Sequence, residues 1–373
     1  MKSLLLGLTV LTLVTVAVAV EPVEGFLTDF QAAQAQAKKE NKPLYLHFTT
    51  MGCTWCRKIE NDIYKTPEGQ KVLAPFVKVT MDCTVPRGQQ PTGPAKAYIQ
   101  LMQKYGGQGY PFLVMTTPEG DILGRLAGYL PLPKFKIEID KVLKRWEAIK
   151  GLQECKAKGD TSSLKYHQCS LTHYLDKDEW AKAGQAAEAL LKLDPKGEKT
   201  DAAQIAYAQL CAALAAKSDA VKIAELQNAV IQADPKNEKG YYEKAYSSRI
   251  KALMIEGQKK PPAEQQEVLR QMVPLLKEMI EKVPNLSNPV TVYNTLFQVQ
   301  GSLGDFDGAI QTLEAFKKTM PTGMDTTQID ATIQKLQEMK QDKDKAESSP
   351  PPETPAETPV EKTDETKTAP AEK

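Results

Sequence analysis

Two cysteines separated by two residues are the side chains of this sequence best suited to chemistry. Cys53 and Cys56 follow an apolar run that ends at Phe48, and the residues after them have the composition of a helix opening. The N-terminus of a helix carries partial positive charge and free N–H groups, which stabilise a nearby thiolate. This arrangement predicts Cys53 as an attacking thiol and Cys56, one turn later, as the thiol that closes a disulfide.

Two other interpretations of the cysteine pair are weaker. A structural zinc site needs four ligands, whereas the chain has three histidines and no second Cys-x-x-Cys pair. A purely structural disulfide across two intervening residues closes a small loop and adds little stability. We therefore predict a redox-active pair that uses no metal and no organic cofactor.

The composition and the two ends of the chain indicate several parts. The 373 residues predict more than one domain, and a formal net charge of +1 gives no electrostatic basis for binding nucleic acid. A positive start, an apolar run and small residues at Ala17 and Ala19 predict a signal peptide over residues 1–20, with an uncleaved anchor as the alternative. Both interpretations predict a periplasmic or secreted protein.

Residues 341–373 are rich in Pro, Glu, Thr and Lys, which predicts a disordered tail or a spacer.

The region 21–150 predicts an alternation of helices and strands. A turn at 118–121 joins the last two predicted strands, which indicates a hairpin. The predicted elements are helix 26–40, strand 44–50, helix 53–64, helix 67–73, strand 76–81, helix 94–105, strand 110–116, strand 122–126 and helix 132–149.

This order of elements resembles the thioredoxin fold. The stretches around the cysteine pair and the first two strands are similar to exported thioredoxin-like proteins, in particular to the C-terminal domain of the periplasmic disulfide reductase. Gly109-Tyr110-Pro111-Phe112 is similar to the cis-proline segment of that family. The resemblance implies an α/β thioredoxin-like fold in which a cis Pro111 lies against the cysteine pair. It also implies that Tyr110 offers its backbone to a bound client chain.

Three residues near the pair depart from the family pattern or add to it. His47 stands six residues before Cys53, where the family often has a buried carboxylate, and is either a proton carrier for the resolving thiol or a hydrogen-bonded core histidine. Trp55 is predicted to be exposed beside the sulfurs, as a client-contact residue or as a lid. Cys83 ends a strand parallel to the first one and is expected at the same sheet edge, as a relay thiol or as a small buried residue.

Residues 151–340 show no strand pattern and are rich in Ala, Leu, Lys and Gln. Helices are predicted to end just before Pro195, Pro235, Pro284 and Pro321, at intervals of 40, 49 and 37 residues. The stretch 293–321 resembles a tetratricopeptide repeat, which implies an all-α helical-repeat (tetratricopeptide-like) domain; an irregular helical bundle is the alternative. Cys155 and Cys169 are predicted to form a local structural disulfide outside the cytoplasm, with two free thiols as the alternative.

Together these features predict an exported thiol–disulfide oxidoreductase. Its substrates would be protein thiols or disulfides, its electron partner another dithiol protein, and its helical region a binding surface for clients. The dipeptide between the cysteines assigns no direction of electron flow. The alternative is a scaffold or chaperone-like binding protein in which the thioredoxin-like half is a docking module.

Overall fold

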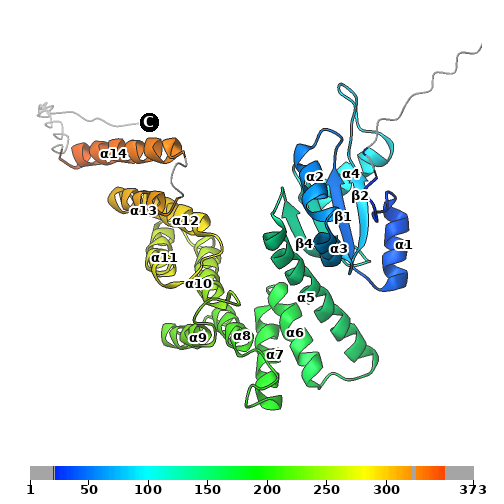
Figure 1. Ribbon diagram of the computed structural model, residues 1–373. Helices are drawn as coiled ribbons and strands as arrows, with labels where there is room; N and C mark the ends of the chain where they lie inside the picture. Colours follow the sequence, from blue (N-terminus) through cyan, green and yellow to red (C-terminus); the bar gives the residue numbers. More distant parts are fainter. Residues whose placement is uncertain (1–19, 21, 321–324, 349–373) are drawn as a thin grey trace, which may run out of the picture. The chain divides into compact units, whose positions relative to one another are not determined.

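The computed structural model describes residue 20, residues 22–320 and residues 325–348 (Figure 1). The predicted signal peptide, apart from Val20, and residues 349–373 of the predicted tail lie outside the described residues. The chain divides into two compact units, residues 1–233 and 234–373. None of the helices in the described ranges is both long enough and apolar enough to cross a bilayer.

The first unit contains a four-stranded sheet in the order β2-β1-β3-β4. Strands β1 and β2 are parallel, and the remaining neighbours are antiparallel. The antiparallel pairing of the last two strands confirms the predicted hairpin. The bounds are β1 Leu44–Thr49, β2 Val77–Asp82, β3 Phe112–Thr116 and β4 Ile122–Ala127.

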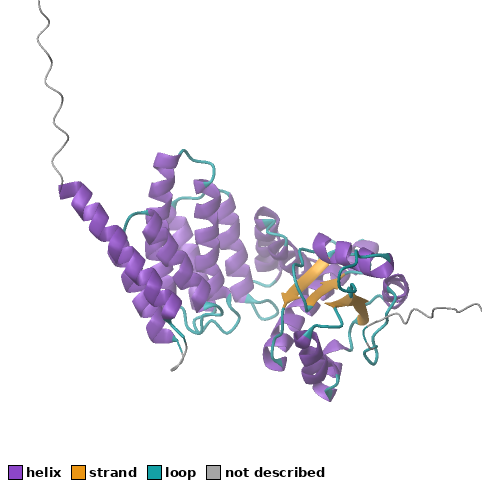
Figure 2. Ribbon diagram, turned by 90° about the horizontal axis from the view of Figure 1, so that it is seen from above, coloured by secondary structure: helices purple, strands orange, loops and turns teal. Residues whose placement is uncertain are grey.

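Helices cover both faces of this sheet (Figure 2). One face packs against α1 Phe30–Glu40 and α4 Gly93–Lys104; the other packs against α2 Thr54–Ile59, η1 Glu60–Tyr64, α3 Pro67–Leu73 and α5 Leu132–Ala157. Every residue of β1 is buried, because this central strand is covered on both sides. Leu46 therefore points to the α1 side, whereas Tyr45 points to the α5 side.

Three helices of this domain differ from their predicted bounds by more than one residue. Helix α1 begins at Phe30 because the Asp29 carboxylate accepts a hydrogen bond from the Ala32 N–H at 2.6 Å and caps the helix. The helix predicted over 53–64 splits into α2 and the π-helical turn η1. Helix α5 continues to Ala157, across the predicted domain boundary at residue 150.

The rest of the described chain is helical. Helices end at Leu193, Ala233, Lys282 and Thr319, which confirms the boundaries read from the four prolines. The bounds are α6 Leu164–Asp176, α7 Trp180–Leu193, α8 Ala202–Ala215, α9 Ala220–Ala233, α10 Tyr241–Gly257, α11 Pro262–Lys282, α12 Pro289–Ser302, α13 Phe306–Thr319 and α14 Thr327–Ser348.

The first residues of the predicted tail are helical. Residues 341–348 belong to α14. This stretch consists mainly of Gln, Asp, Lys, Glu and Ala, and the first proline of the tail comes only at Pro350. Side chains of this kind extend an existing helix at little cost, so the polar composition alone does not mark the helix end.

Candidate functional site

Cys53 and Cys56 form a disulfide at the start of α2. Their sulfurs are 2.06 Å apart and their Cα atoms 5.2 Å. The Cys53 Sγ also caps the helix, because it accepts a hydrogen bond from the Cys56 N–H at 3.1 Å. Cys53 is half-buried, whereas Cys56 is 1% exposed. An external thiol or disulfide can therefore reach Cys53 but not Cys56, which fits the predicted order of attack and resolution.

The peptide bond between Tyr110 and Pro111 is cis, which confirms the conformation implied by the family resemblance. These two residues line a groove of about 280 Å³. The rest of the lining comes from the loop before β3, from Phe112 at the start of β3, and from Ala127 and Gly128, the neighbours of Phe112 and Pro111 at the end of β4. The groove therefore lies directly beside the cis-proline.

Trp55 is exposed, as predicted, with 57% of its surface open to solvent. Its ring stacks on Tyr129, with the centroids 5.9 Å apart. Two more residues of the same helical stretch hold Tyr129: the Lys58 ammonium lies over its ring at 5.1 Å, and its hydroxyl donates to the Asp62 carboxylate at 2.7 Å. This cluster ties the loop after β4, which borders the groove, to the helix that carries the disulfide.

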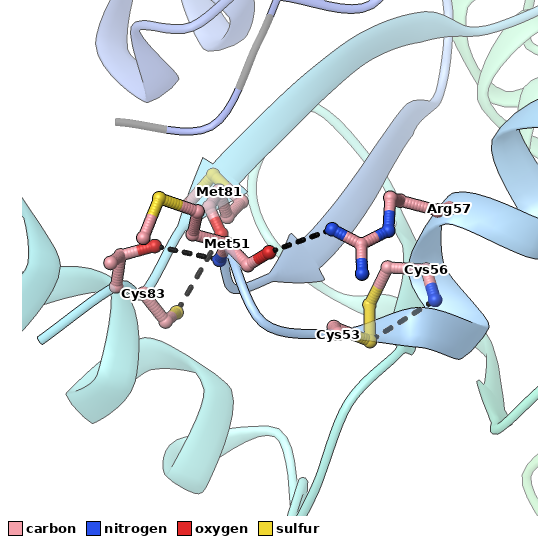
Figure 3. The surroundings of a disulfide bond; sticks show 7 residues. Met51, Cys53, Cys56, Arg57, Met81 and Cys83 are labelled. Carbon is pink, nitrogen blue, oxygen red and sulfur yellow. Dashed lines mark hydrogen bonds between the residues drawn. A yellow bond between two sulfur atoms is a disulfide. The ribbon is translucent and has the colours of Figure 1, made fainter. Parts of the chain in front are cut away.

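Cys83 lies at the same sheet edge as the disulfide, which confirms its predicted placement (Figure 3). It follows β2, and its N–H donates to the Thr49 carbonyl at 2.8 Å. Next to it, the Thr84 hydroxyl accepts a hydrogen bond from the Met51 N–H at 2.9 Å. Met51 belongs to the loop that leads to Cys53, so the end of β2 supports the loop that positions the Cys53 sulfur.

The Cys83 side chain is buried and contacts the residue before the cis-proline. Burial raises the pKa of its thiol to about 11, and the nearby Tyr110 hydroxyl partly opposes this rise. Burial is also the main cause of the raised pKa of Tyr110. Both groups are therefore neutral at neutral pH. Cys83 acts here as a packed thiol beside Tyr110; its relay role remains a prediction.

In the reduced, folded protein, we expect a thiol reagent such as iodoacetamide to modify Cys53 and to spare Cys83. A buried thiol with a raised pKa supplies little thiolate, which is the reactive form. The modified residues are identified by mass spectrometry after digestion, and unfolding in urea should make Cys83 reactive. Equal labelling rates for both thiols in the folded protein would contradict this placement.

His47 lies in β1, fully buried, on the sheet face that packs against η1 and α5. Its ring meets Tyr64 edge to face, with 5.3 Å between centroids. Neither ring nitrogen has a hydrogen-bond partner among the described residues. Burial lowers the pKa of His47 to about 3, so the imidazole is neutral at neutral pH. The neutral imidazole matches the prediction of a core histidine. The hydrogen bond predicted for such a histidine has no partner among the described residues. The role as a proton carrier remains a prediction.

Comparison with known proteins identifies the family to which this part of the chain is similar. Residues 30–143 match the family of the thioredoxin-like domain. This region is a thioredoxin-like domain. It contains the disulfide, the cis-proline and His47, and it covers about a third of the chain. No curated protein matches the chain.

Several solved structures are similar to the thioredoxin-like domain. The DsbH oxidoreductase is 23% identical, with 34% of this chain and 90% of that chain covered and a TM-score of 0.27. A thioredoxin from Thermus thermophilus is 21% identical over 34% and 92% of the two chains, with a TM-score of 0.28. The reduced C-terminal domain of DsbD from Neisseria meningitidis is 22% identical over 30% and 91%, with a TM-score of 0.25.

The predicted disulfide between Cys155 and Cys169 is absent from the structure. Both residues are free thiols, Cys155 buried in α5 and Cys169 half-buried in α6. The Cys169 side chain lies against Gly151, one helical turn before Cys155. Sequence spacing brings the two cysteines near each other but does not fix their side-chain directions.

Tyr129 is the residue of the site that sequence reasoning missed. It is far from the cysteine pair in the sequence and carries no motif of its own. One sequence feature could have indicated Tyr129, although only weakly. It is an aromatic residue directly after Gly128, where the second strand of the hairpin ends.

Proposed function

We propose that this protein is an exported thiol–disulfide oxidoreductase that exchanges disulfides with protein clients through Cys53 and Cys56. The observation that carries the proposal is the asymmetry of the pair: one sulfur is accessible and the other buried, in a disulfide at the start of a helix. Its position in a thioredoxin-like domain supports the same chemistry.

In the reducing direction, the Cys53 thiolate attacks one sulfur of a client disulfide. The bond between the client sulfurs breaks, and the displaced client thiolate takes up a proton. Cys56 then loses its proton and attacks the Cys53 sulfur of the mixed disulfide. This releases the second client thiol and forms the Cys53–Cys56 disulfide seen here. Two electrons pass to the client, and the oxidising direction follows the same steps in reverse.

The groove beside the cis-proline would hold the client chain during these steps. The resemblance to the family gives Tyr110 a backbone contact with the client and gives Pro111 a place against the sulfurs. Trp55, held by Tyr129, would form the exposed apolar wall next to Cys53. A wall of this kind favours client cysteines that are flanked by apolar side chains.

The remaining parts of the chain would place this chemistry outside the cytoplasm and recruit its partners. The apolar start of the chain supports export, with tethering as a variant. A second dithiol protein would supply or accept the electrons. The helix pairs from α6 onward support a repeat-like surface that binds clients.

The decisive experiment is capture of the mixed disulfide. The Cys56→Ser variant retains the attacking thiol but lacks the resolving one, so in cells it should accumulate client complexes that a reducing agent releases. The Cys53→Ser variant and the double variant should accumulate none. Cys211→Ser, which changes a buried residue of α8, is the matched control and should behave like the wild type.

Two outcomes would overturn the proposal. One is a Cys56→Ser variant that captures no more protein than the double variant does. The other is a Cys53→Ser variant that handles clients as well as the wild type, which would favour the scaffold function instead. The reduction potential of the couple, measured against glutathione, then assigns the direction: about −270 mV for a reductase and about −120 mV for a disulfide donor.

A further inference from the structure

Two more thiols lie opposite each other on helices α5 and α6 of the first unit. Contacts between these helices run in opposite sequence directions, so the helices are antiparallel neighbours (Figure 1). The three contacts are the ion pair of Arg145 with Asp176, the packing of Gly151 against Cys169, and the ion pair of Glu154 with Lys165 at 2.8 Å. Cys155 and Cys169 therefore lie on the facing sides of the two helices.

The geometry of antiparallel helices brings these two sulfurs towards each other. A helical side chain leans towards the N-terminus of its own helix. Cys155 therefore leans towards the level of Gly151, and Cys169 leans in the opposite direction, towards the level of Cys155. A Cβ atom placed on Gly151 would be only 2.3 Å from the Cys169 Sγ, so the missing side chain at 151 gives this sulfur its space.

The surroundings of the two thiols differ in a way that suits disulfide exchange. Cys155 is 4% exposed, whereas Cys169 is half-buried and open to a small reagent. The Lys165 ammonium lies close enough to interact with both sulfurs. Burial and the neighbouring Cys155 raise the pKa of Cys169, and the Lys165 charge opposes that rise. Because Cys169 is the more accessible of the two thiols, it is the attacking thiol of this pair, and Cys155 is the resolving thiol.

We propose that Cys155 and Cys169 form a second redox centre, which closes into a disulfide between α5 and α6 by exchange with a small-molecule disulfide of the glutathione type. The Cys169 thiolate attacks one sulfur of glutathione disulfide and displaces one glutathione thiolate. Cys155 then loses its proton and attacks the Cys169 sulfur, which displaces the second glutathione. Two thiols are oxidised, one disulfide is reduced, and the two protons end on the two glutathione molecules.

This centre is separate from the Cys53–Cys56 couple and goes beyond the proposed function. Helix α5 carries Phe135 and Trp146 into the core of the thioredoxin-like domain, and its last turns carry Cys155. A bond from Cys155 to Cys169 would therefore attach α6 covalently to a helix of the catalytic domain. The bond would restrain the junction between the two regions under oxidising conditions and release it under reducing ones.

The test uses the full chain with Cys53→Ser and Cys56→Ser, so that failure of the first couple cannot affect the result. The reduced protein is equilibrated with glutathione disulfide, alkylated and digested with trypsin. The digestion separates Cys155, in peptide 151–156, from Cys169, in peptide 166–177. We expect these two peptides to be recovered linked, and the intact protein to lose the mass of two hydrogen atoms.

Further single substitutions in this background separate the possible outcomes. Cys155→Ser and Cys169→Ser should each abolish the linked peptide, whereas Cys211→Ser should leave its yield unchanged. Circular dichroism checks that each variant folds. The proposal is overturned if both thiols are alkylated after equilibration. It is also overturned if Cys169 stops at a stable glutathione adduct while Cys155 remains a thiol.

Discussion

Replacing His47 by Leu should remove much of the acid sensitivity of the thioredoxin-like domain. Burial lowers the pKa of His47 to about 3 in the folded protein, against 6.5 for an ordinary histidine. The unfolded chain therefore binds a proton at His47 between these two values, whereas the folded chain does not. The wild-type protein should lose free energy of unfolding as the pH falls from 6.5 towards 3, by about 1.4 kcal/mol per pH unit.

The measurement is urea unfolding of the wild type and the variant at several pH values from about 6 to about 4. The two proteins are compared by the slope of their free energy of unfolding against pH. The absolute free energies are not compared, because leucine also changes packing at all pH values. Leu46→Val, a buried substitution in the same strand that removes no titratable group, is the matched control and should retain the wild-type slope. If the free energy of unfolding depended on pH equally in the wild type and in His47→Leu, His47 would become charged without penalty in the folded protein.

Phe135→Ala should be among the most destabilising single substitutions in the thioredoxin-like domain. Phe135 is fully buried in α5 and packs in the core with Tyr45, at an inter-ring distance of 6.4 Å. Removing the ring loses its burial and leaves a cavity between α5 and the sheet. The expected loss in the free energy of unfolding is about 3–5 kcal/mol.

Ile137→Ala tests the same helix without touching the core. Ile137 is 56% exposed, so its truncation should change the free energy of unfolding by less than about 0.5 kcal/mol. Urea unfolding followed by circular dichroism compares the two variants with the wild type. Similar losses for both variants would contradict the core contact of Phe135 as the cause, because alanine is the better helix former at both positions.

The first domain could be predicted from its sequence because its local signals agree with its tertiary structure. The continuous apolar run of β1 marks a strand buried on both faces, and Thr66 with Pro67 marks the start of α3. The cis conformation of Pro111 followed from the family resemblance alone. These features are local or inherited with the family, so no contact between distant residues had to be known.

The features that sequence reasoning missed depend on contacts between distant residues. The π-helical turn η1 places Asp62 against Tyr129 and the Tyr64 hydroxyl 2.9 Å from that of Tyr45, and neither partner is near in the sequence. Helix α5 was predicted over residues 132–149. The helix continues to Ala157, and the missing side chain of Gly151 makes room for Cys169 on α6.

The continuity of α5 also has a consequence for limited proteolysis and for exchange of domains. This helix is packed against the sheet by its first half and against α6 by its second half, so residues 132–157 form no flexible linker. A protease acting on the folded protein should cut elsewhere first. A fragment ended at residue 150 would lack Leu152 and Cys155, which are buried in the intact chain. The thioredoxin-like domain and the helices next to it should therefore be transferred between proteins as one piece.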